Sequence, residues 1–244
     1  MSTYVISDVH GNYEGYMKIL ERINFSDKDT LYVNGDVIDR GMGGVKILQH
    51  MMMQPNIYPI LGNHEYAAGT CLRFLMKEIT DESIQDIEED TINNLIEWQN
   101  IGGQYTMDAF HKLAKEEKQD IVDYLDEFSL YEEVSVNGRQ FVIVHAGLAN
   151  FSPDRPLDDY EMYELIFKAP DYDTVYFKDK YLVTGHLPTK AIKGNPRPNK
   201  IYINNNHIAI DCASGYNGCV GCICLDTFEE FYYTCETCSK TIIN

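Results

Sequence analysis

Five short apolar runs, each followed by polar residues and glycine, constrain the fold of this chain more than any other feature. They begin at Thr3, Leu31, Ile57, Phe141 and Tyr181. β-Branched and aromatic residues that stop at a glycine are typical of strands, and unbroken apolar runs indicate burial on both faces. Segments 14–23 and 44–53 have helical composition, which favours βαβ crossovers. The sequence therefore predicts an α/β fold with a ligand site at the carboxyl ends of its strands.

Two further regions differ from this pattern. Residues from about 66 to 128 are rich in Glu, Asp, Lys, Leu and Ile and contain no Pro, which predicts a helical insertion. Its helices are expected near 67–78, 83–99 and 116–128. Alternating runs from about 200 to 234 predict antiparallel strands. With 244 residues, the chain is expected to form a single domain over residues 1–244.

The charge balance is strongly acidic. Twenty Lys and Arg stand against 38 Asp and Glu, a net charge of −18. A surface of this sign repels phosphate backbones, so non-specific nucleic-acid binding is not expected, and an enzyme for anionic substrates would need a local cationic site such as metal ions. No apolar run approaches the ~18 residues of a membrane span, so no membrane partner is expected. The first predicted strand begins at Thr3 and leaves no room for a signal peptide, which predicts a cytoplasmic protein.

Metal-binding side chains follow the predicted strands. Asp8 and His10 lie two residues apart on an extended segment and therefore face the same side, and Asp36 follows Asp8 by 28 residues, the spacing of a βαβ unit. Three more candidates, each after its own strand, are Asn63, His145 and His186. These three can hold a second ion, with Asp36 bridging the two. Carboxylate and imidazole ligands suit Mn²⁺, Fe²⁺ or Zn²⁺, and two such ions can activate water and neutralise a phosphate.

Five sequence blocks resemble a known family. The blocks Ser7–Asn12, Gly35–Gly41 and Gly62–Glu65 are similar to the three signature blocks of the phosphoprotein phosphatase branch of the calcineurin-like metallophosphoesterases. His145-Ala146-Gly147 and Gly185-His186 resemble the two later histidine blocks in their bacterial and phage form. Together the blocks extend from residue 7 to residue 186, about three-quarters of the chain.

The resemblance implies a β-sandwich of two mixed sheets flanked by helices, a dinuclear metal centre and hydrolysis of phosphomonoesters. It implies a serine/threonine protein phosphatase-like enzyme that acts on a phosphorylated protein or a small phosphoester. The implied ions are two divalent metals, Mn²⁺ first, with Fe or Zn as alternatives. The implied ligands are Asp8, His10 and Asp36 for one ion, and Asp36, Asn63, His145 and His186 for the other.

His64 is the candidate general acid. It follows Asn63 directly and is therefore expected near the same phosphate, where an imidazolium could protonate the leaving alkoxide. Asp39 is its candidate partner, a pairing that the resemblance also implies, and the competing interpretation is a turn or helix-cap carboxylate. Arg40 and Asn63 are the predicted phosphate-binding residues. The Arg40 guanidinium is planar and can donate to two phosphate oxygens at once. The competing role for Arg40 is an ion pair with a nearby carboxylate.

The resemblance has one gap. Family members of the protein phosphatase type carry a second phosphate-binding Arg between the two late histidine blocks, where this chain has Lys168 or Ala169. The sequence leaves open whether this clamp is missing or whether Lys168, Arg155 or Arg197 replaces it.

Other functions share these blocks. Symmetrical dinucleoside tetraphosphate hydrolases and phosphatases of nucleic-acid ends carry the same metal residues, and each is an alternative substrate class. A catalytically idle scaffold of the same fold is an alternative of another kind, against which the complete set of ligands argues.

The cysteines raise a separate hypothesis. Seven Cys are present, mostly near the C-terminus, which favours reduced thiols or a metal knuckle over a disulfide framework. The two C-x₂-C pairs, separated by twelve residues, have the spacing of a zinc knuckle. They are Cys219 with Cys222 and Cys235 with Cys238. The competing interpretation is a β-hairpin with small thiols that need not converge on an ion.

Overall fold

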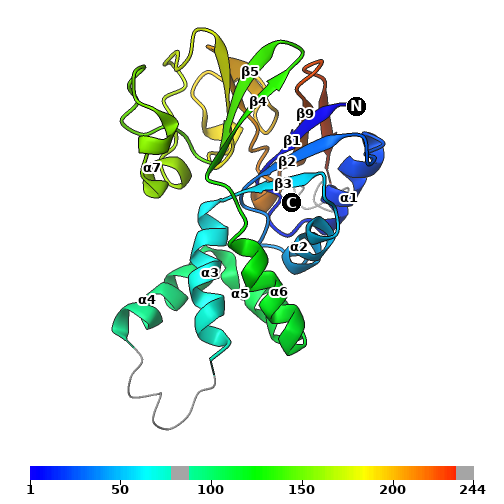
Figure 1. Cartoon of the computed structure of the whole chain (residues 1–244), viewed down its shortest axis with the longest axis vertical. Helices are drawn as coiled ribbons and strands as arrows, with labels where there is room; N and C mark the ends of the chain where they lie inside the picture. The colour runs from blue at the N-terminus through cyan, green and yellow to red at the C-terminus, as the bar shows by residue number, and fades with distance from the viewer. Residues whose placement is uncertain (78–87, 235–244) are drawn as a thin grey trace, which may run out of the picture.

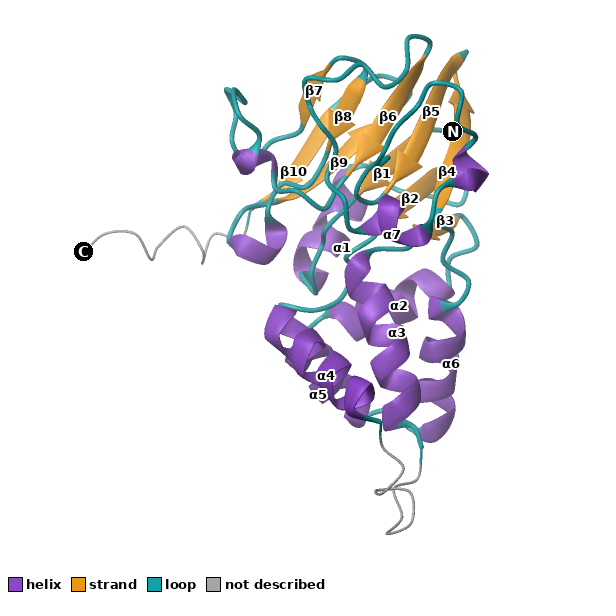
Figure 2. Cartoon of the chain, turned by 90° about the vertical axis from the view of Figure 1, so that its left-hand side faces the viewer, coloured by secondary structure: helices purple, strands orange, loops and turns teal. Residues whose placement is uncertain are grey.

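Two five-stranded mixed sheets pack face to face in the computed structural model, which describes residues 1–77 and 88–234 (Figures 1 and 2). The first sheet has the order β10-β9-β1-β2-β3, with β1–β3 parallel and β9 and β10 antiparallel. Its strands are β1 (Thr3–Ile6), β2 (Thr30–Asn34), β3 (Ile57–Ile60), β9 (Val220–Cys224) and β10 (Glu230–Tyr233). The α/β fold with two mixed sheets is thus confirmed.

The second sheet has the order β4-β5-β6-β8-β7. Its strands are β4 (Tyr131–Val136), β5 (Arg139–Val144), β6 (Lys180–Thr184), β7 (Tyr202–Asn204) and β8 (His207–Ala209). The late strands lie close to their predicted positions, but their pairing is not purely antiparallel, because β8 runs parallel to β6 and antiparallel to β7. A local sequence pattern does not specify that neighbour, since β6 lies more than 20 residues earlier in the chain.

Most positions of the apolar runs are buried on both faces, as the sequence predicts, but Tyr58 of β3 is exposed. Val5 and Ile223 pair across β1 and β9 and belong to the core between the sheets, together with the Ile143–Val183 pair of β5 and β6. The other side of the first sheet is covered by the crossover helices α1 (Tyr13–Arg22) and α2 (Gly44–Met52). In sheets of this kind, ligands bind at the carboxyl ends of the buried strands.

The helical insertion extends away from the sandwich at one end (Figure 1). It contains α3 (Asn63–Leu75), α4 (Glu89–Trp98), α5 (Gln104–His111) and α6 (Lys115–Leu125), with a π-helical turn over Gln99–Gly103. Helix α3 begins four residues earlier than predicted, because the Glu65 carboxylate accepts the Gly62 backbone N–H and closes the first turn. The start of the helix predicted at 83–99 lies outside the described residues. That residues 1–244 form a single domain stays a prediction.

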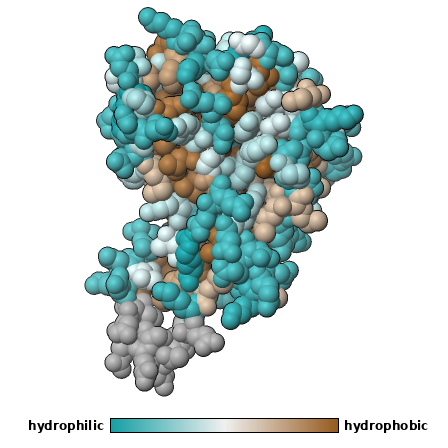
Figure 3. All heavy atoms as spheres, viewed as in Figure 1, coloured by the Kyte–Doolittle hydropathy of each residue, from teal (hydrophilic) through white to brown (hydrophobic). Residues whose placement is uncertain are grey.

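Two described helices were not predicted. Helix α5 follows a break at Gly102, whose φ is 113°, and it begins without a capping side chain, so the sequence carries no start signal for it. The short helix α7 (Met162–Ile166) has only five residues, too few for a periodic pattern. Within the described residues, no helix has the length and apolar character needed to cross a membrane. The face drawn in Figure 3 is mostly polar, with apolar side chains in separate patches.

Candidate metal centre

The loops after the parallel strands hold their polar residues in an unusual backbone conformation. Asp8, His10, Asp36 and His186 have positive φ angles of 51°, 49°, 51° and 64°. This left-handed region is uncommon for residues other than glycine, and it persists where the surrounding structure enforces it, often at functional sites. A Cβ on Gly35 would lie 2.4 Å from His145 Nδ1, so glycine is required there for the loop to pass the ring.

Asp36 lies at the centre of the cluster. Its Oδ1 is 3.3 Å from His145 Nε2, and its Oδ2 is 3.7 Å from His10 Nε2 and 3.8 Å from His64 Nε2. Two groups of potential ligands share this carboxylate, His10–Asp36–His64 and Asp36–His145–His186, each with its ligand atoms within 4.8 Å of one another. The nearby imidazoles hold the pKa of Asp36 well below its usual range even though burial opposes that shift. This donor set fits two divalent cations that share Asp36.

Asn63 completes the second group. Its Oδ1 lies 2.9 Å from His186 Nδ1 and 3.1 Å from His145 Nε2. The rings are oriented from behind, since His145 Nδ1 donates to the Asn34 carbonyl at 3.0 Å and His10 Nδ1 donates to the Ile38 carbonyl at 3.1 Å. Such backbone contacts fix the tautomer and direct Nε2 toward the cation position. The structure thus brings Asp36, Asn63, His145 and His186 together.

Asp8 is placed differently from the other predicted ligands. Its carboxylate accepts the His186 backbone N–H at 3.0 and 3.1 Å and a hydrogen bond from the Ser7 hydroxyl. The first group of ligand atoms contains His64 beside His10 and Asp36, and the assignment of Asp8 to that ion stays a prediction. Burial and the negative charges of Asp211 and Asp36 raise the pKa of Asp8, so the site gathers negative charge that a cation would offset.

His64 and Asp39 form a buried pair. His64 Nδ1 is 2.7 Å from Asp39 Oδ2, and both side chains are almost fully excluded from solvent. Asp39 also accepts hydrogen bonds from Trp98 Nε1 at 2.9 Å and from the Thr106 hydroxyl at 2.6 Å. Burial alone would lower the pKa of His64, but the charges of Asp36 and Asp39 outweigh it and raise the pKa. The pair therefore presents Nε2 to the site, with Nδ1–H held by Asp39.

Arg40 lies next to two of the clustered histidines. Its guanidinium nitrogens lie 2.8 Å from His10 Nε2 and 3.0 Å from His64 Nε2. The same guanidinium stacks on Tyr216 at 4.4 Å from the ring centre, and Lys190 Nζ lies 5.2 Å from that ring. In the part of the chain that the structure describes, Arg40 has no carboxylate partner, so the competing ion-pair role has no support there. Neither Tyr216 nor Lys190 was predicted, and the sequence holds no signal for the stack.

The candidates for a second phosphate-binding Arg are otherwise engaged. Arg155 lies 2.6 Å from Glu164, and Arg197 lies 2.9 Å from Glu230. Lys168 Nζ lies 5.1 Å from the Tyr163 ring. Among the described residues, Lys190 is a further cation next to the Arg40–Tyr216 stack.

The zinc hypothesis receives no support from the described residues. Cys219 is part of the core between the sheets, whereas Cys222 belongs to the core under the crossover helices. The Cys219 thiol donates to the Asn199 carbonyl at 3.1 Å. Cys235 and Cys238 lie outside the described residues.

Glu65 is a residue of the third block to which the sequence assigns no role. Its buried carboxylate accepts the backbone N–H groups of Asp36, Val37, Ile38 and Gly62 at 2.7, 2.8, 3.2 and 3.2 Å. These bonds hold the loop that carries the bridging carboxylate. Glu65 thus positions Asp36 from behind.

Replacing Glu65 by Ala is expected to lower the free energy of unfolding by about 3 kcal/mol or more. The change leaves four buried N–H groups without an acceptor, and each such group costs about 1–3 kcal/mol. Urea denaturation followed by circular dichroism measures the loss. Glu116→Ala, at an exposed position on α6, is the control and should stay within about 0.5 kcal/mol of the original protein. A loss below 1 kcal/mol for Glu65→Ala would contradict the positioning role.

Comparison with known proteins gives a family for this arrangement. Residues 1–218 match the family model described as calcineurin-like phosphoesterase. A symmetrical bis(5'-nucleosyl)-tetraphosphatase of Buchnera aphidicola subsp. Acyrthosiphon pisum (strain 5A) is 40% identical over 67 residues, 27% of this chain and 24% of that protein. The corresponding protein of Erwinia tasmaniensis is 30% identical over 101 residues, 40% of this chain and 37% of that protein. The alignments thus span well under half of these curated relatives.

Solved structures extend the likeness of fold over nearly the whole chain. A crystal structure described as a candidate diadenosine tetraphosphatase has a TM-score of 0.64 at 16% identity and covers 95% of this chain and 92% of its own. A serine/threonine phosphatase from Saccharomyces cerevisiae has a TM-score of 0.59 at 13% identity, with coverage of 93% and 73%. At these identities the likeness shows a common fold and says nothing about the substrate.

Proposed function

The chain belongs to the calcineurin-like phosphoesterase family, and on this basis we propose that it is a metal-dependent hydrolase of dinucleoside polyphosphates. The names of the curated relatives favour this alternative over the serine/threonine protein phosphatase that the sequence blocks first suggest. The resemblance to a serine/threonine phosphatase rests on fold alone.

The observation that carries the proposal is the stack of cations on Tyr216. Arg40 lies beside His10 and His64, where it suits the phosphate at the metal ligands. Lys190 contacts the same Tyr216 ring as Arg40, with the Lys190 Nζ 5.2 Å from the ring centre. A polyphosphate chain continues past the phosphate at the metal ligands, so it suits a second cation next to Arg40. On a protein of net charge −18, two cations clustered beside the metal ligands indicate a site for a negatively charged substrate.

The residues divide the work as follows. The residues that would hold two divalent ions are Asp8, His10, Asp36, Asn63, His145 and His186, and such ions, when bound, activate water and neutralise phosphate charge. Arg40 can donate two N–H groups to a phosphate in a fixed plane. His64, with its Nδ1–H held by Asp39, can donate a proton from Nε2 to the leaving group. The choice of Mn²⁺ and the cytoplasmic location stay predictions.

A substrate panel with a Lys190 variant tests the proposal. We expect the protein with Mn²⁺ to cleave a dinucleoside tetraphosphate faster than a phosphopeptide at equal concentration. Lys190→Ala should raise KM for the tetraphosphate about fivefold to tenfold, because a charge-assisted contact to the outer phosphate is lost, with little change for p-nitrophenyl phosphate. Steady-state kinetics on the three substrates measures both effects.

Lys193→Ala is the matched control, since Lys193 is an exposed lysine in the same loop region. It should leave all three substrates unaffected. Preferential cleavage of the phosphopeptide would return the assignment to a protein phosphatase. Absence of turnover on every substrate, p-nitrophenyl phosphate included, would favour the non-catalytic scaffold.

A further inference from the structure

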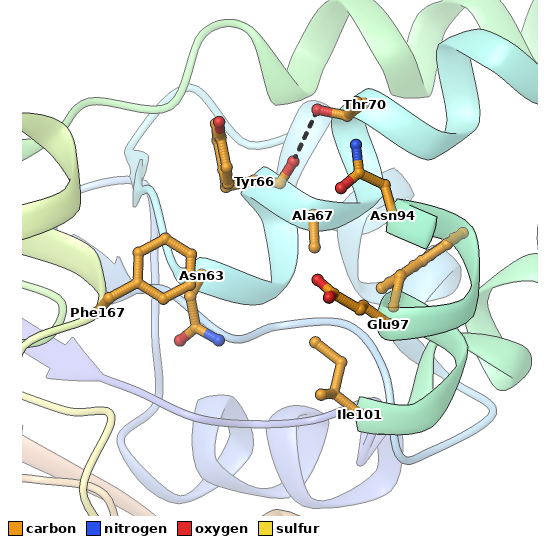
Figure 4. Close-up of a pocket in the computed structure, with 9 residues that line it drawn as sticks. Asn63, Tyr66, Ala67, Thr70, Asn94, Glu97, Ile101 and Phe167 are labelled. Carbon is orange, nitrogen blue, oxygen red and sulfur yellow. Dashed lines mark hydrogen bonds between the residues drawn. The ribbon is translucent and has the colours of Figure 1, made fainter. Parts of the chain in front are cut away.

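A cavity of about 320 Å³ opens beside the metal ligands (Figure 4). Asn63, whose amide oxygen contacts His145 and His186, is also one of the cavity's lining residues. The remaining wall comes from α3, from α4 with the turn after it, and from Phe167 behind α7. The volume falls at the lower end of the roughly 300–1,000 Å³ typical of small-molecule sites. A ligand whose phosphate lies at the metal ligands can thus reach this cavity with its next chemical group.

The walls are aromatic on one side. Tyr66 and Phe167 meet edge to face with ring centres 6.1 Å apart, and Figure 4 shows both on the side opposite Glu97 and Ile101. Tyr163 stacks on Phe167 at 5.1 Å and 28°, which restricts the position of the Phe167 ring. Tyr66 nevertheless keeps 42% of its surface exposed, although it is a large aromatic residue. Aromatic faces of this kind stack readily on planar rings.

The charge of the cavity selects against a second phosphate. Glu97 lines it from α4, together with the Asn94 amide. A carboxylate repels a phosphate, but it accepts hydrogen bonds from an amino group, and an asparagine amide both donates and accepts. Arg40 adjoins the cavity, since its Nε lies 3.4 Å from the carbonyl of the lining residue Ile101, but it is not itself one of the lining residues. The cavity therefore suits an uncharged planar ring that carries N–H donors.

We infer that this cavity binds a nucleobase of the substrate, by stacking on Tyr66 and Phe167 and by hydrogen bonding to Glu97 and Asn94. The inference rests on the proposed function, because it concerns the nucleoside attached to the phosphate at the metal ligands. It adds a specificity site that the metal ligands alone do not provide.

Fluorescence of Trp98 provides a test that does not depend on turnover. Trp98 is the only tryptophan and lines the cavity, so a base bound there should change its emission. The metal-loaded protein is titrated with AMP and with ribose 5-phosphate, which lacks the base. AMP is expected to bind about tenfold more tightly or better, from the strength of base–aromatic stacking. Tyr66→Ala should remove most of that difference while leaving ribose 5-phosphate binding unchanged.

Tyr58→Ala is the matched control, because Tyr58 is a tyrosine of similar exposure, 45%, on β3 and does not line the cavity. It should keep the full preference for AMP. Phe167→Ala, on a different element, repeats the test if Tyr66→Ala does not fold. Equal affinities for AMP and ribose 5-phosphate, or a preference that survives both variants, would overturn the inference.

Two further outcomes separate this inference from the proposed function. Binding of benzyl phosphate as tightly as AMP would show a general apolar cavity and would reject the nucleobase. A preference for AMP without cleavage of dinucleoside tetraphosphate would support the base site and reject the proposed substrate. Cleavage of dinucleoside tetraphosphate without a preference for AMP would support the proposed substrate and reject the base site.

Discussion

Asp36→Asn is expected to reduce activity by more than about 100-fold. Changes in residues that only hydrogen-bond to a metal ligand typically cost up to about 100-fold, and a change in a ligand itself should cost more. Asp36 contacts both groups of ligand atoms, with Oδ1 toward His145 and Oδ2 toward His10 and His64. Asn keeps the shape but removes the negative charge that two cations would share, so both ions should bind weakly. Metal content after dialysis and kcat/KM at saturating Mn²⁺ measure the two consequences.

Asp120→Asn is a control for the same chemical change, because Asp120 is exposed on α6. It should leave metal content and rate unchanged. Near-normal rates for Asp36→Asn at saturating Mn²⁺ would reject the bridging role. Loss of one ion with the other retained would mean that Asp36 serves a single cation.

The grouping of the candidate metal ligands could be predicted from the places where the strands end. Apolar runs followed by Asp, Asn or His define where buried strands stop, and the carboxyl ends of neighbouring strands meet at one edge of a sheet. For that reason Asp36, Asn63, His145 and His186 could be grouped although they are spread over 150 residues. The periodic segments also predicted the crossover helices α1 and α2 close to their observed positions.

Contacts made by the helical insertion could not be predicted. Asp39 is held by Trp98 and Thr106, about 60 residues later, and the break at Gly102 sets how the two helices that carry them approach Asp39. A helical period says which face is apolar but not which site that face meets. The same holds for Lys190 and Tyr216, which come together with Arg40 from distant loops.

His64→Asn is expected to lower kcat for alkyl phosphates about 10²- to 10⁴-fold, the usual contribution of a positioned proton donor. An alkoxide leaving group needs a proton, and the His64 imidazole held by Asp39 is placed to supply it. p-Nitrophenolate needs less assistance, so the loss on p-nitrophenyl phosphate should be smaller. A nucleotide leaving a dinucleoside tetraphosphate departs as a stabilised anion, so its loss should resemble that of p-nitrophenyl phosphate. Rates on the three substrates measure the difference.

His111→Asn, at an exposed position at the end of α5, is the control and should leave all rates unchanged. Asp39→Asn should reproduce the substrate dependence in weaker form, because it removes one of the two charges that raise the pKa of His64. The alternative role for His64 is that of a metal ligand, because its Nε2 also lies 3.8 Å from Asp36 within a group of potential ligands. Equal losses on all three substrates, together with reduced metal content, would mean that His64 holds a cation and that another group supplies the proton.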